Sequence, residues 1–132
     1  MFFKLYLIAL PVFLAVYMIW LTLVAKNFYA KQLGFLMNKN PNLLAALIFY
    51  LIFIAGLIIF VITPALEKQS WISAVLMGAF FGLVTYSTYN LTNLATVKDW
   101  PLLVTVIDLL WGITLSATVS AITYFIATKI GI

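Results

Sequence analysis

The sequence contains no cysteine, no histidine and no arginine, and only three acidic residues. Without cysteine and histidine the chain has no thiol nucleophile, no imidazole base, no disulfide and no usual zinc or copper ligand set. Without arginine it has no planar group for bidentate contact with phosphates or base edges. A net charge of +4 spread over an apolar chain is also not typical of nucleic-acid binding. We therefore expect no metal site, no cofactor, no nucleic-acid partner and none of the most common catalytic sets.

Charge of either sign is scarce, since charged residues make up 8% of the 132 residues and hydrophobic residues 67%. Soluble domains carry roughly a quarter charged residues, so an ordinary soluble domain is excluded. A helix needs about 20 apolar residues to cross ~30 Å of hydrocarbon. Stretches of this kind lie at about 5–25, 43–63, 72–90 and 102–128. We predict an all-α integral membrane four-helix bundle that forms a single transmembrane domain over residues 1–132.

The lysines leave the orientation of this bundle open. An even number of spans places both termini on the same side of the membrane. The numbers of lysines on the two sides are too similar for the positive-inside rule to decide between them: Lys4, Lys68 and Lys129 lie on the terminal side, and Lys26, Lys31, Lys39 and Lys98 on the other.

The sequence also leads to expectations for the connection after the first span and for the end of the second span. The long connection 26–42 has apolar residues at helical spacing, so it either extends the first helix along the membrane interface or forms a polar loop. Pro64 is expected to end the second helix, because proline cannot donate the backbone hydrogen bond that would continue it.

Small residues recur at a spacing of four in the last two spans. Gly78 and Gly82 form a GxxxG pattern in the third span, and Gly112 and Ser116 continue a polar stripe in the fourth. Small residues let membrane helices approach closely. We expect these four residues to pack the third span against the fourth.

Asp108 is the one charged residue inside the four predicted spans. An ionised carboxylate well inside a span costs at least ~2.5 kcal/mol and typically marks a functional site; the alternative is a structural acid bonded to the third span. The facing arc of the third span carries hydroxyl and amide groups, and an indole adjoins the acid. We predict a ligand-binding site formed by Tyr86, Tyr89, Asn90, Asn93, Asp108 and Trp111.

Three functions fit this pattern. The first is binding or transport of a lipid or small amphipathic ligand in a polar cleft between the third and fourth spans. The second is an accessory or structural subunit of a larger membrane complex, docked through its small-residue face. The third, a lipid-modifying enzyme, ranks lowest because titrating groups are few. Membrane lipids are the expected partners, and a homodimer or a larger membrane partner is left open.

Four segments have a distinctive residue order: Val24-Ala25-Lys26-x-Phe28-Tyr29-x-x-Gln32-Leu33-Gly34, Tyr86-x-x-Tyr89-x-Leu91-Thr92-Asn93-Leu94-Ala95-Thr96, Trp100-Pro101 and Asp108-x-x-Trp111-Gly112. In these segments, and over nearly its whole length, the chain resembles a family of small bacterial inner-membrane proteins of unknown function. The resemblance implies a four-helix protein of the bacterial inner (cytoplasmic) membrane without an established activity. It also favours a lipid as the ligand.

The chain departs from the family pattern at two positions. Many relatives carry acidic residues where this chain has Tyr17 and Asn90. A relay of several acids would keep only Asp108 here, so the resemblance argues against proton-coupled transport. A binding site with hydrogen-bonding groups and aromatic walls is compatible with both changes.

Overall fold

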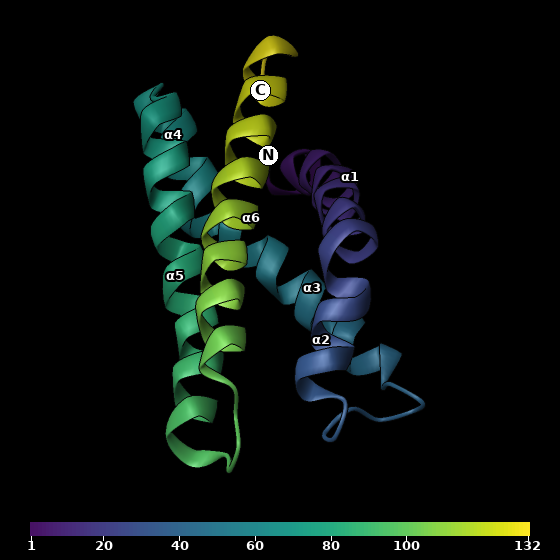
Figure 1. Cartoon of the computed structure of the whole chain (residues 1–132). Helices are drawn as coiled ribbons and strands as arrows, with labels where there is room; N and C mark the ends of the chain where they lie inside the picture. The colour runs from purple at the N-terminus through teal and green to yellow at the C-terminus, as the bar shows by residue number, and fades with distance from the viewer.

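The computed structural model describes residues 1–132, which are helical along almost their whole length (Figure 1). Its elements are α1 (Phe2–Trp20), η1 (Leu21–Ala25), α2 (Lys26–Leu33), α3 (Leu43–Leu57), η2 (Ile58–Ile62), α4 (Thr63–Lys68), α5 (Trp71–Thr96) and α6 (Leu102–Lys129), where η marks a π-helical turn. They join into four continuous helices, each long and apolar enough to cross a membrane: Phe2–Leu33, Leu43–Lys68, Trp71–Thr96 and Leu102–Lys129. The predicted all-α bundle of four spans is confirmed. Both chain ends lie in the upper half of the view, away from the loop between α5 and α6 (Figure 1).

The first long helix runs past the predicted span. It continues through η1 into α2, which adds eight residues, so the first part of connection 26–42 extends the first helix and its remainder, 34–42, is a loop. The loop that follows ends at Asn42, whose side chain accepts a hydrogen bond of 3.1 Å from the backbone N–H of Ala45 and caps α3.

The second long helix continues past Pro64, and the expectation that it ends there is wrong. A proline inside an α-helix crowds the carbonyl four residues before it. Here the π-helical turn η2 ends two residues before Pro64, and the N–H of Thr63 bonds to the carbonyl of Ile58, five residues back. The wider turn relieves this crowding, and the helix ends only at Lys68, before Gln69 adopts a left-handed φ of 53°.

The helices α5 and α6 lie side by side along most of their length (Figure 1) and share the largest helix–helix contact in the molecule. A Cβ atom added at Gly78 would lie 2.8 Å from the carbonyl oxygen of Ser116. One added at Gly82 would overlap the carbonyl oxygen of Gly112. The residues expected to pack these two spans therefore lie together at their contact, where glycine permits the close approach.

The remaining helices pack on this pair through an apolar core. Leu5 and Phe13 of α1, Ile54 of α3 and Leu115 of α6 are among its fully buried side chains. Large apolar side chains also cover the outside of the bundle, for example Leu7 of α1, which is 73% exposed. An apolar exterior of this extent suits a protein surrounded by lipid.

Candidate functional site

A cavity of about 630 Å³ lies between the first long helix and the α5–α6 pair. All four long helices and the loop before α3 contribute to its lining, which consists of Tyr17, Trp20, Leu21, Ala25, Tyr29, Met37, Phe49, Thr85, Tyr86, Tyr89 and Asp108. The prediction placed the site between the third and fourth spans. Both spans line the cavity, through Tyr86 and Asp108 among others, and the first long helix lines it as well. The close glycine contact holds the two spans together beside it.

Asp108 is the acidic group of this cavity, and its side chain is 8% exposed. The hydroxyl of Tyr29 donates to its Oδ1 at 2.5 Å, and Nδ2 of Asn90 donates to its Oδ2 at 2.6 Å. The same Nδ2 donates to the carbonyl oxygen of Tyr86 at 3.1 Å, which fixes the amide on α5. These bonds tie the carboxylate of α6 to both α2 and α5, so its orientation depends on three of the four long helices.

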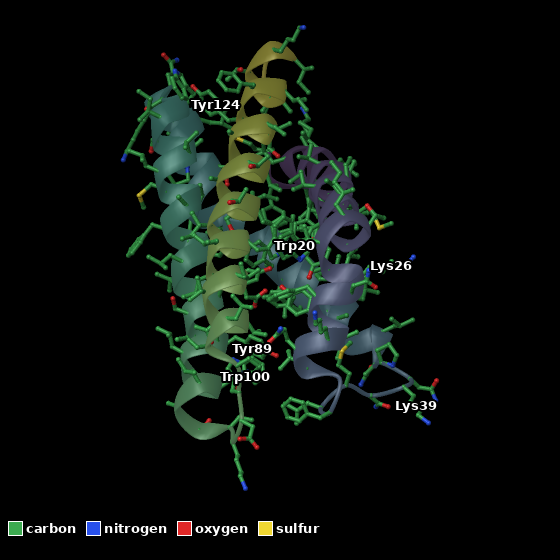
Figure 2. All side chains as sticks on the ribbon, viewed as in Figure 1. Trp20, Lys26, Lys39, Tyr89, Trp100 and Tyr124 are labelled. Atoms are coloured by element: carbon green, nitrogen blue, oxygen red, sulfur yellow. The ribbon has the colours of Figure 1, made fainter.

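The carboxylate retains hydrogen-bonding capacity toward the cavity. An ionised carboxylate can accept about four hydrogen bonds, and Asp108 accepts two, both from neutral donors. No lysine is among the lining residues. Lys26 and Lys39 point away from the bundle (Figure 2) and are exposed. The site thus presents a positioned acceptor with no basic residue beside it.

Aromatic side chains form most of the cavity wall. Trp20 lies between α1 and α6 (Figure 2) and stacks on Trp111, with ring centroids 4.4 Å apart and planes 8° apart. Tyr17 packs its ring against Trp111 edge to face at 5.6 Å. Tyr86 packs in the same manner against Phe53, at 6.1 Å. Because their neighbours hold these rings, the wall is formed in advance of any ligand.

The structure separates the six predicted ligand-binding residues into three groups. Tyr86, Tyr89 and Asp108 line the cavity. Asn90 is fully buried behind it and holds Asp108. The last two do not line the cavity either: Asn93 is half-buried near the end of α5, and Trp111 stacks on Trp20 from outside the cavity.

Sequence reasoning missed the contribution of the first long helix. Tyr29 bonds to an acid 79 residues away, a pairing that no local pattern indicates. A partial signal existed, because Tyr29 lies in a segment of distinctive residue order and Tyr17 occupies a position that departs from the resembled pattern. Tyr17 and Asn90, the two departures, both lie at this site.

One family model covers nearly the whole chain, including the cavity. The family model described as "Predicted membrane protein (DUF2177)" matches residues 2–125, a range that contains every residue lining the cavity. No curated protein and no solved structure matches the chain. Four apolar helices and a match over nearly the whole length make the chain a multi-pass membrane protein. It belongs to the family of predicted membrane proteins DUF2177.

Proposed function

We propose that the protein binds a lipid or another small amphipathic molecule in the cavity around Asp108. The observation that carries the proposal is one buried carboxylate facing a preformed, mostly apolar cavity. Its volume of about 630 Å³ falls in the range of roughly 300–1,000 Å³ typical of small-molecule sites. Ionisable groups inside membrane proteins are rare and most often functional.

The two kinds of lining suit the two ends of an amphipathic molecule. Leu21, Met37 and Phe49 offer apolar surface to a chain, while Asp108 and Thr85 offer acceptors to a polar head. Such molecules dissolve in the lipid phase that surrounds the bundle. The proposal places the protein in the bacterial inner membrane, in keeping with the family resemblance.

A substitution that narrows the cavity tests this proposal. Ala25 lines the cavity, whereas Ala30 of the same long helix is exposed. Native mass spectrometry of protein extracted in mild detergent should show a small molecule retained by the unmodified chain and by Ala30→Leu. The Ala25→Leu protein should retain less of it, because the added atoms narrow the cavity.

Circular dichroism of both variants serves as the folding control. An unmodified protein without any retained molecule, in extracts that contain its native lipids, would contradict the proposal. So would a folded Ala25→Leu protein that retains the molecule as well as Ala30→Leu does.

A further inference from the structure

We infer that the polar head of the ligand is cationic, an amine or a quaternary ammonium group, with Asp108 as its counter-ion. The inference rests on the proposed function and adds the charge of the ligand to it. It is carried by the position of one acid within a set of neutral, largely aromatic groups.

The charge balance of the cavity is the first argument. Asp108 is the one charged residue among the eleven that line it. Its bonding partners, the hydroxyl of Tyr29 and the amide of Asn90, orient the carboxylate without neutralising it. A buried carboxylate is strongly stabilised by a nearby positive charge. A cationic head supplies that charge and uses the remaining acceptor capacity of the carboxylate.

The aromatic lining is the second argument. Six aromatic side chains line the cavity, and Tyr29 combines its ring with the hydroxyl that contacts Asp108. Cations are attracted to the faces of aromatic rings, most strongly to tryptophan and where water is excluded, and groups of such rings recognise quaternary ammonium ligands. The stacked pair of Trp20 and Trp111 holds one of these rings in place.

The same groups disfavour the other head types. A carboxylate or phosphate head would place a second negative charge beside Asp108, with no lysine in the lining to compensate it. A neutral alcohol head forms hydrogen bonds but leaves the charge of Asp108 unpaired. Amphiphiles with a single cationic head are therefore the class that fits.

Three probes with the same chain and different heads test the inference: dodecylamine, dodecanol and dodecanoate. At pH 7 the amine is protonated, since an alkyl ammonium group resembles the lysine side chain, whose pKa is about 10.4. Each probe is titrated into the full chain in neutral detergent, and bound probe is counted by native mass spectrometry. The unmodified protein should bind dodecylamine at least tenfold more tightly than dodecanol and should bind dodecanoate most weakly.

Two acid-to-amide variants test whether the preference for the amine probe depends on Asp108. Asp108→Asn should lose most of the preference for dodecylamine over dodecanol, and the aromatic lining accounts for what is left. Asp99→Asn removes the same charge from the exposed loop before α6, where φ is 62°, a conformation that asparagine adopts readily, and should keep the full preference. Ala25→Leu should bind dodecylamine more weakly than the unmodified protein does, which ties the binding to the cavity.

The outcomes separate the two proposals. Equal binding of all three probes by the unmodified protein, or tighter binding of dodecanoate, overturns the cationic head and leaves the binding function standing. An amine preference that is undiminished in folded Asp108→Asn, or binding of dodecylamine that is as tight in Ala25→Leu as in the unmodified protein, also overturns it. Binding of no probe by the unmodified protein counts against both.

Discussion

Replacing Gly82 with alanine should destabilise the bundle, whereas the same change at Gly56 should be tolerated. At Gly82 the new Cβ overlaps the carbonyl oxygen of Gly112 and lies 2.7 Å from Oγ of Ser116. The obstacle includes the backbone of α6, so relief requires α5 and α6 to move apart. At Gly56 the new Cβ meets the far end of the Phe81 ring at 2.8 Å, and a ring can turn aside.

The two substitutions differ only in this obstacle, which fixes the expected magnitude. Both glycines lie inside helices, so both changes gain the same helix propensity of about 1 kcal/mol. Overpacking a close contact typically costs ~1–3 kcal/mol. The unfolding free energy of Gly82→Ala should therefore lie about 1–3 kcal/mol below that of Gly56→Ala.

Reversible unfolding in mixed detergent micelles measures this difference. The helical circular dichroism signal of each protein is followed as a denaturing detergent replaces a mild one, and the midpoints are compared with that of the unmodified chain. A Gly82→Ala protein as stable as Gly56→Ala, or more stable, would refute the view that close backbone approach holds α5 to α6.

The same unfolding assay checks three further predictions. Tyr29→Phe should lower the unfolding free energy by about 1–2 kcal/mol, because it removes a hydrogen bond to a carboxylate, and a double-mutant cycle with Asp108→Asn should show the two changes to be coupled; additive losses would contradict this. Ser120→Ala should leave stability unchanged or raise it by up to ~1 kcal/mol, because the buried Oγ has no hydrogen-bond partner, and a clear loss would be evidence against that reasoning. Gln69→Asn should raise stability by up to about 1 kcal/mol, since asparagine tolerates the left-handed φ of 53° better than glutamine does; no gain would mean that the backbone there is unstrained.

The fold was predictable because it depends on local features of the chain. Lengths of apolar sequence determine how many helices can cross a membrane, and a spacing of four places Gly78, Gly82 and Ser116 on single helix faces. The α5–α6 contact follows from these faces alone. The continuation of the second helix past Pro64 could not be predicted, because the sequence around Pro64 does not reveal that a π-helical turn precedes it.

The site was predictable only where it lies on α5 and α6. Polar residues marked Tyr86, Tyr89 and Asp108 as members of facing arcs, and all three line the cavity. Periodicity does not indicate that the first long helix also lines this space, so the prediction named only the third and fourth spans. The contributions of Trp20 and Tyr29 depend on tertiary packing across more than 70 residues and have no local signature.

The π-helical turn η1 makes the site sensitive to the number of residues in the first helix as well as to their identity. A π-helical turn holds one more residue than an α-helical turn, so every side chain after it is rotated by about 100° relative to an uninterrupted α-helix. Tyr29 lies just beyond Leu21–Ala25 and reaches Asp108 in this register. Deleting a single residue within that turn would restore a straight helix and direct the hydroxyl away from the acid. An insertion or deletion among residues 22–24, which do not line the cavity, would therefore switch the Tyr29–Asp108 contact without replacing any cavity residue.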